Sequence, residues 1–161
     1  ASRGLGDVYK RQIRVGTAGG LSKDVKVGDV VIASGAHYEG VINTYLIPQT
    51  HFSAIASFNL VRAAADAAGD DPDVVVAPVI SRDRFYNVPE EVNEAAAKVG
   101  TAGAEMEAGA LYGLASLYGK EALAVLTISD HMTVPSEDMT PEERETKFVK
   151  ALELAVAAAL S

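Results

Sequence analysis

The sequence predicts an α/β fold of three layers, αβα, in which helices flank a central mixed β-sheet. Two observations predict it. Apolar runs rich in β-branched residues alternate along the chain with segments whose apolar residues recur at helical spacing. These runs are apolar throughout, which is typical of strands buried on both faces. With 161 residues and 48% hydrophobic residues, the chain can close one core and is too short for two ordinary domains.

The first two predicted strands are short. Residues 13–16 form a β-branched run that stops at the small-residue sequence 17–20, where we expect a turn. A loop at the carboxyl end of a buried strand often holds a ligand. Residues 30–33 are continuously apolar and favour an interior strand. Residues 37–46 alternate weakly and could form another strand or a surface excursion.

Two further strands follow. Residues 74–80 are predicted to form a buried strand, and Pro78 indicates that the later half of this strand lies at an edge or a bulge. The clearest strand is 122–128, and the polar residues 129–131 follow it directly. Functional residues often lie at that end of a strand in α/β sheets.

Helices are predicted between and after these strands, with glycines that end them. They are residues 59–68 with Asn59 as cap and Gly69 as stop, 89–98 closed by Gly100, and 105–118 closed by Gly119. Thr140 through Glu143 forms a capping box with proline at the first helical position, so a last helix should run from there to about Leu160.

Composition excludes several classes of function. The net charge of −8, from 22 acidic and 14 basic residues, argues against nucleic acid and anionic membranes as partners. The absence of cysteine excludes disulfides and thiolate zinc sites and fits a cytoplasmic protein. The apolar tract 149–160 is too short to cross a bilayer, and the chain opens with no secretion signal.

The opening residues 1–12 differ in character from the rest of the chain. They lack a start methionine, and residues 6–12 resemble translated library-adapter DNA. We interpret residues 1–12 as a non-native leader and expect a single domain over residues 13–161.

Arg14 and the glycine-rich residues 16–20 could hold an anion. The loop lacks the spacing of a dinucleotide fingerprint and the lysine of a P-loop, and alone it indicates only a tight turn. A guanidinium beside backbone amides can bind a phosphate or carboxylate. The alternative is a strand arginine paired with a surface acid. No metal site is expected, because the three histidines lack ligand spacing.

Carboxylates at two places invite a chemical role. Glu105 and Glu107 open a predicted helix, where acids commonly complement the helix dipole. One of them could instead accept hydrogen bonds from two adjacent sugar hydroxyls. Asp130 could cap a turn, or it could donate a proton if its surroundings are apolar enough.

Three motifs together resemble the hexameric, bacterial-type purine nucleoside phosphorylases. They are RVGTAG at 14–19, AEMEAG at 104–109 followed by LYG at 111–113, and TISDH at 127–131, in the same order and at matching intervals. The similarity runs from about residue 13 to the end.

The resemblance implies a role for each motif residue. Arg14 and Thr17 would contribute to the phosphate site, and Asp130 would give a proton to purine N7 with help from Ser129 and Arg144. The remaining roles are ribose binding by Met106 and Glu107 with Glu105 beside them, and base contacts by Phe85, Tyr86 and Ala104.

The resemblance also implies the reaction and its setting. The family converts purine (deoxy)ribonucleosides and inorganic phosphate to free base and (deoxy)ribose 1-phosphate, needs no cofactor, and works in the cytoplasm as a trimer of dimers. Its members carry a further N-terminal section with phosphate-binding residues and strands of the sheet. We therefore expect a sheet incomplete at the N-terminus, with an unpaired edge, an open apolar face and impaired activity.

Three alternatives stay open. A nucleosidase of the same superfamily would use water, which Arg14 argues against. A uridine phosphorylase would be expected to carry glutamine and arginine for the pyrimidine edge, where this chain has Ser129 and Asp130. A non-catalytic nucleoside-binding fragment would bind purine nucleoside without turning it over.

Overall fold

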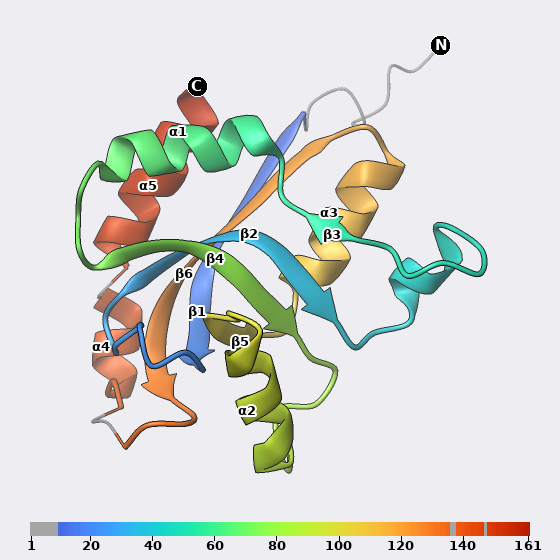
Figure 1. Ribbon diagram of the computed structural model, residues 1–161. Helices are drawn as coiled ribbons and strands as arrows, with labels where there is room; N and C mark the ends of the chain where they lie inside the picture. Colours follow the sequence, from blue (N-terminus) through green and yellow to red (C-terminus); the bar gives the residue numbers. More distant parts are fainter. Residues whose placement is uncertain (1–9, 136–137, 147) are drawn as a thin grey trace.

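The computed structural model describes residues 10–161 apart from 136–137 and 147 (Figure 1). Most of the expected leader, residues 1–9, lies outside the described residues. The strands are β1 (Arg11–Gly20), β2 (Val30–Tyr38), β3 (Ala54–Ile55), β4 (Val74–Ser81), β5 (Gly103–Glu105) and β6 (Glu121–His131). The helices are α1 (Phe58–Ala68), α2 (Glu90–Lys98), α3 (Ala108–Leu117), α4 (Pro141–Thr146) and α5 (Val149–Leu160), with a 3₁₀ turn, η2, at Ile42–Tyr45.

The strands form one mixed sheet in the order β3-β2-β4-β5-β1-β6. β1 runs parallel to β6, and β4 runs parallel to both β2 and β5. β1 and β5 pair antiparallel, as do β2 and β3. β2 also pairs antiparallel with β6 over four residues, so five of the strands close into a ring. The predicted mixed sheet is confirmed.

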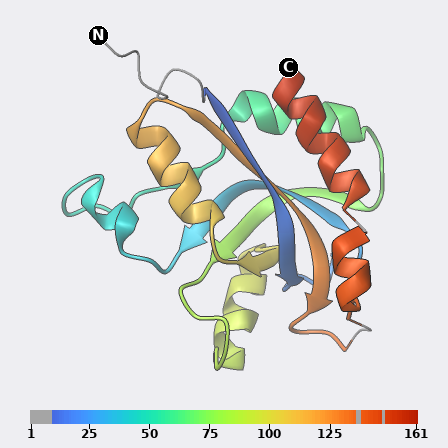
Figure 2. The same cartoon turned by 180° about the vertical axis from the view of Figure 1, so that it is seen from behind.

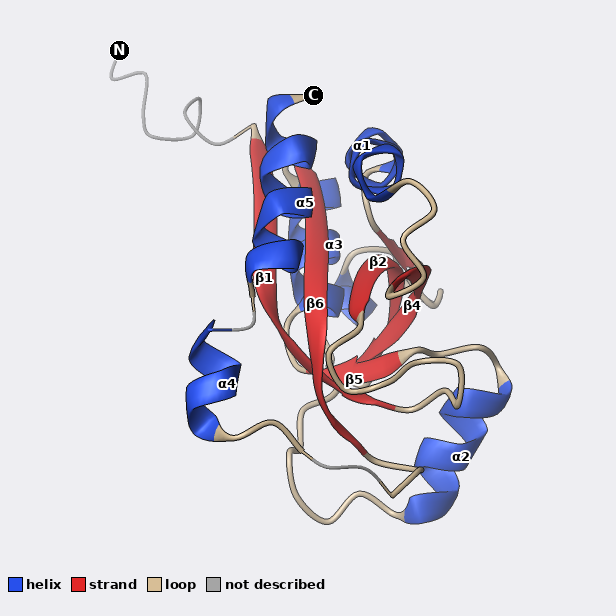
Figure 3. Ribbon diagram, turned by 90° about the vertical axis from the view of Figure 1, so that its left-hand side faces the viewer, coloured by secondary structure: helices blue, strands red, loops and turns tan. Residues whose placement is uncertain are grey.

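Helices cover the sheet on two sides. α1 and α5 pack against each other, and α3 lies across β1 and β6 from α5 (Figures 2 and 3). The core between the layers is built mainly from β2 and β6, because both strands are buried on both faces. Its largest members include Ile32, Leu60, Tyr112, Leu123 and Leu126. The α/β architecture therefore agrees with the sequence-based expectation. No helix of the described residues is long and apolar enough to cross a membrane.

β1 is longer than its β-branched residues predict, and the expected turn at 17–20 is wrong. These residues continue the strand, pairing with β6 as far as His131 and, at Gly19 and Gly20, with β5. Small side chains permit this close approach: a Cβ at Gly20 would collide with the His131 ring. The strand also begins at Arg11, two residues before the expected start, and Arg11 forms an ion pair with Glu121.

The strands expected at 30–33, 74–80 and 122–128 are confirmed, and each extends further. Pro78 lies in an interior strand and not at an edge, because β4 has β2 and β5 as neighbours. The β2–β4 register shifts between Ala33 and Ala36, opposite Pro78, so the predicted bulge is present. The weakly alternating residues 37–46 divide between the end of β2 and the η2 turn.

The first two helices agree with prediction, except for one cap. α1 begins at Phe58, so Asn59 lies within the helix and is not its cap. Ser57 precedes the helix, and its hydroxyl accepts a hydrogen bond from the Ala122 amide, which ties the start of α1 to β6. Gly69 ends α1 with a positive φ of 58°, a conformation that favours glycine. α2 also ends at the expected place.

The predicted helix over 105–118 starts three residues late. α3 begins at Ala108, and Glu105 belongs to β5. The reason is the Glu105 side chain, which accepts hydrogen bonds from the Glu107 and Ala108 amides at 2.9 Å each. A carboxylate that caps a helix from outside cannot at the same time be a residue of its first turn.

The capping box is present at the expected position. The Thr140 amide donates to Glu143 Oε2 at 2.9 Å, and the Glu143 amide donates to Thr140 Oγ1 at 3.2 Å. The helix expected to continue to Leu160 is instead two helices, α4 and α5, on either side of residue 147.

Replacing Thr140 with Ala removes one of the two capping bonds. We expect this to destabilise the first turn of α4 by about 1 kcal/mol. Amide hydrogen exchange at Glu143 measures the loss directly, and it should be about fivefold faster for a change of that size. Thr50→Ala, at an exposed loop position, is the matched control and should leave that exchange rate unchanged.

One edge of β1 is open within the described residues. β5 pairs only with Gly19 and Gly20, which leaves residues 11–18 without a strand partner on that side. Leu114 and Leu117 of α3 are exposed, as is Tyr118, which follows the helix. The expectation of an unpaired edge and an open apolar face agrees with this arrangement.

Candidate active site

A cleft of about 330 Å³ lies where β1, β4, β5 and β6 end, bordered by the loop after β4 and by α4. Ten of the eleven residues predicted from the sequence to form a site line it, and Tyr86 does not. They are Arg14, Thr17, Phe85, Ala104, Glu105, Met106, Glu107, Ser129, Asp130 and Arg144. These residues come from segments more than a hundred positions apart, so the fold brings them together.

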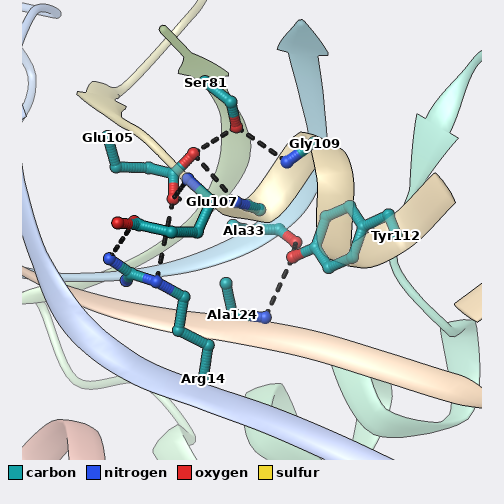
Figure 4. A network of polar contacts seen from close by, with 9 residues as sticks. Arg14, Ala33, Ser81, Glu105, Glu107, Gly109, Tyr112 and Ala124 are labelled. Atoms are coloured by element: carbon teal, nitrogen blue, oxygen red, sulfur yellow. Dashed lines mark hydrogen bonds and ion pairs between the residues drawn. The ribbon is translucent and has the colours of Figure 1, made fainter. Parts of the chain in front are cut away.

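Arg14 crosses the cleft to the start of α3. Its Nη2 donates a short hydrogen bond to Glu107 Oε2, and its Nε lies 4.0 Å from Glu105 Oε2 (Figure 4). Nη1 is buried without a hydrogen-bond partner. A Cβ at Gly16 would collide with this guanidinium, so glycine there allows Arg14 to lie back along the strand. Arg14 is thus paired with an acid, but the acid belongs to the same cleft.

Glu105 lies beneath this end of the cleft and accepts hydrogen bonds from the segments around it. Its side chain is fully buried and also accepts a hydrogen bond from Ser81 Oγ, which in turn accepts one from the Gly109 amide (Figure 4). The hydrogen bonds from Ser81 Oγ and from the Glu107 and Ala108 amides together occupy both carboxylate oxygens of Glu105. Glu107 differs, since its side chain is 56% exposed and open to the cleft.

Tyr112 fixes α3 to the sheet beneath the cleft. Its hydroxyl donates to the Ala33 carbonyl at 2.7 Å and accepts from the Ala124 amide at 2.9 Å. Burial raises the pKa of Tyr112, so the phenol stays protonated and keeps both bonds. These two hydrogen bonds therefore fix the position of α3, and with it Glu107, relative to β2 and β6.

Asp130 lies on β6, beyond the end of the apolar run. Ser129 Oγ donates to Asp130 Oδ1 at 2.7 Å, and Arg144 Nη2 lies 3.9 Å from the same oxygen. Arg144 reaches in from α4, where its Nε donates to the Met139 carbonyl. The Met139 amide donates to the Ser129 carbonyl, which ties the preceding loop to β6. The cation predicted to assist Asp130 therefore lies beside it.

The aromatic pair lies on the loop between β4 and α2. Both rings are exposed, and Phe85 lines the cleft. Tyr86 does not line it and meets the Phe85 ring edge-on, with ring centroids 4.8 Å apart. Ala104 and Met106 line the adjacent wall from β5 and the turn that follows it. A flat apolar ligand could contact Phe85 from the cleft side.

Sequence reasoning missed several residues of the cleft. Arg82, Arg84 and Val88 follow β4, and Met132 follows β6. The two arginines could have been found by the rule already applied to Asp130, because they directly follow a predicted strand. Arg82 is 3% exposed, and burial lowers its pKa.

His131 has structural partners. His131 contacts the Ser22 carbonyl at 3.0 Å and accepts hydrogen bonds from the Thr133 and Val134 amides. Within the described part of the chain, no group of three or more acidic or histidine side chains could hold a metal ion.

The family is decided by comparison with known proteins. The family model described as "Phosphorylase superfamily" matches residues 9–161. The chain belongs to the phosphorylase superfamily. This match covers all of the strands and helices that surround the cleft.

Three relatives found by the comparison are each named purine nucleoside phosphorylase DeoD-type. One from Clostridium perfringens is 45% identical over 155 residues, which cover 94% of this chain and 65% of the relative. One from Listeria welshimeri is 43% identical, covering 94% and 64%. One from Myxococcus xanthus is 41% identical, covering 89% and 60%. This phosphorylase-superfamily chain thus spans slightly less than two thirds of the length of these curated relatives.

Proposed function

We propose that this chain forms the larger part of a purine nucleoside phosphorylase. The observation that carries the proposal is that Arg14 and Asp130 line one cleft, as an anion site and a proton donor for a single sugar–base bond require. The names of relatives at 41–45% identity support the purine substrate class.

The reaction follows from the residue types on the two sides of the cleft. Phosphate held by Arg14 and Thr17 attacks the anomeric carbon C1′ as the bond from C1′ to N9 of the base breaks. The sugar gains oxocarbenium character, and the departing purine gains negative charge. A proton from Asp130 to N7 neutralises that charge, and the products are free purine and (deoxy)ribose 1-phosphate.

Arg14 must change partners for this to happen. In the structure its guanidinium is bonded to Glu107. Phosphate is a stronger bidentate acceptor for arginine than a half-exposed carboxylate. Once phosphate binds, Glu107 is released, and its two oxygens can accept hydrogen bonds from the ribose 2′- and 3′-hydroxyls beside Met106. Glu105 acts in this proposal as the residue that positions Glu107.

The base would lie between Phe85 and the β6 end of the cleft. Phe85 offers an aromatic face, and Ala104 leaves room for the purine. Ser129 and Arg144 support Asp130, the first by its hydrogen bond and the second by its charge. Tyr86 would act through its edge-on contact with Phe85.

The setting of the enzyme follows the same proposal. Inorganic phosphate is the co-substrate, and the chemistry calls for no organic cofactor. We propose that the protein acts in the cytoplasm as a homo-oligomer, a trimer of dimers, with no nucleic-acid or membrane partner. Sedimentation velocity of the protein measures the oligomeric state.

The phosphate dependence of base release tests the reaction class. We expect inosine to yield hypoxanthine only when phosphate is present, with uridine cleaved far more slowly. The assay is made on the 161-residue chain and on the same chain extended by the N-terminal section that its relatives carry. Equal release without phosphate would identify a nucleosidase. Nucleoside binding without release in either protein would identify a non-catalytic binder.

A further inference from the structure

Arg82 is a buried cation without a hydrogen-bond acceptor. It follows β4 directly and lines the cleft. Its Nε, Nη1 and Nη2 are all buried and have no hydrogen-bond partner in the described part of the chain. The carboxylate of Glu39 lies 4.0 Å from Nε, which is too far for a hydrogen bond. All five N–H donors of a guanidinium are therefore unused.

The buried guanidinium of Arg82 needs a hydrogen-bond acceptor that the described residues do not supply. Arginine keeps its proton even when buried, so Arg82 cannot escape the cost of burial by becoming neutral. A buried polar group without a partner is rare in native proteins and often marks an ion or ligand site. Arg84 lies two residues further along and lines the same cleft, and its positive charge adds to that of Arg82.

Arg82 and Arg84 differ in their charged neighbours from the other two arginines that line the cleft, Arg14 and Arg144. Arg14 faces Glu105 and Glu107, and Arg144 faces Asp130. Among the described residues that line the cleft, these are the three carboxylates, so none is left for the two arginines after β4. The protein as a whole has a net charge of −8, which makes this local excess of positive charge unusual.

We propose that Arg82 and Arg84 bind a phosphate group at the β4 end of the cleft, separate from the phosphate position at Arg14. In the sheet order β4-β5-β1-β6, this end lies opposite the β6 strand that carries Asp130. The orientation rests on the proposed function: the Arg82 amide donates to the Glu105 carbonyl at 2.9 Å, so Arg82 lies next to the turn that carries Met106 and Glu107, the proposed ribose residues. The phosphate is either free inorganic phosphate or an ester on the sugar of the substrate. Binding requires the Arg82 side chain to turn toward the cleft through its rotatable bonds.

The test uses two probes, inorganic phosphate and purine nucleoside 5′-monophosphate, with the unphosphorylated nucleoside as reference. Arg82→Met removes the charge and keeps much of the side-chain volume. If free phosphate is the ligand, the wild-type chain binds two phosphates and Arg82→Met binds one. If the ester is the ligand, the monophosphate binds the wild-type chain about tenfold to a hundredfold more tightly than the nucleoside, and Arg82→Met abolishes that preference.

Thermal unfolding separates ligand binding from a structural role. Without ligand, Arg82→Met should unfold at a higher temperature than wild type, because it removes a buried charge that has no hydrogen bond and whose carboxylate partner, Glu39, lies 4.0 Å away. Arg62→Met, at an exposed position on α1, is the matched control and should leave the binding of both probes unchanged. The proposal is overturned if Arg82→Met leaves phosphate stoichiometry and the monophosphate preference unchanged.

Two further variants keep the result interpretable. Arg84→Met, at an exposed position, gives the answer if Arg82→Met does not fold, and it should weaken the same binding severalfold. If Arg84→Met also leaves the binding of both probes unchanged, the inference fails. Arg14→Gln should remove the other phosphate position and leave the Arg82 position intact. Unchanged binding in Arg14→Gln would instead contradict the proposed function and leave this inference standing.

Discussion

Replacing Asp130 with Ala is expected to lower kcat for inosine phosphorolysis by about a hundredfold or more, the usual contribution of a positioned general acid. Nucleoside binding should change far less, because Asp130 contributes mainly when negative charge develops on the departing purine. Steady-state kinetics at saturating phosphate measure both quantities. An unchanged kcat would refute the assignment of Asp130 as the acid.

A substrate that needs no proton provides the sharper control. A purine nucleoside methylated at N7 already carries positive charge on its base, so its base leaves without protonation. Asp130→Ala should therefore cleave this substrate at close to the wild-type rate. Loss of activity on both substrates would indicate damage to the cleft instead of loss of an acid. Asp66→Ala removes an equal charge from an exposed position on α1 and should leave both rates unchanged.

Replacing Arg14 with Gln is expected to raise the KM for phosphate by about tenfold to a hundredfold, the loss of a charge-assisted hydrogen-bond pair. The guanidinium reaches across the cleft, and Nη1 has no hydrogen-bond partner among the residues that the structure describes. Arg14→Lys should recover only part of the affinity, because an ammonium keeps the charge and lacks the planar fork. The measurement is the dependence of rate on phosphate at saturating nucleoside.

The pairing of Arg14 with Glu107 gives this experiment a second arm. Glu107→Gln should raise the KM for nucleoside and not the KM for phosphate, since Glu107 is proposed to hold the sugar. The neutral glutamine oxygen is also a weaker acceptor for Arg14 than the carboxylate, so phosphate should bind at least as well as in wild type. A weaker affinity for phosphate in Glu107→Gln would contradict the proposed exchange of partners.

Residues at the carboxyl ends of strands were the most predictable part of the site. Asp130 was identified because it follows an apolar run typical of a buried strand, and Arg14 because it precedes the glycine-rich residues at the end of another such run. The capping box at Thr140 was equally clear, because its hydrogen bonds depend on residues only three apart. Information of this local kind can be read directly from the sequence.

Predictions failed where distant segments compete for the same backbone. The residues 17–20 looked like a turn, yet two neighbouring strands supply hydrogen bonds that extend β1 through them. Glu105 looked like the first residue of a helix, yet its buried carboxylate caps that helix from the adjacent strand. In both cases, tertiary contacts outweighed the local preference.

The sequence by itself determined the α/β class, the strands buried on both faces, and the motif residues that accompany them, because periodicity and strand ends are local properties. Only the tertiary structure decided which carboxylate is free to meet a ligand. Glu105 and Glu107 are two residues apart, but Ser81 and the amides at the start of α3 occupy the first, whereas the second is 56% exposed and is bonded to Arg14. It also decided that Arg82 is buried without an acceptor, since burial depends on what every other segment packs against it.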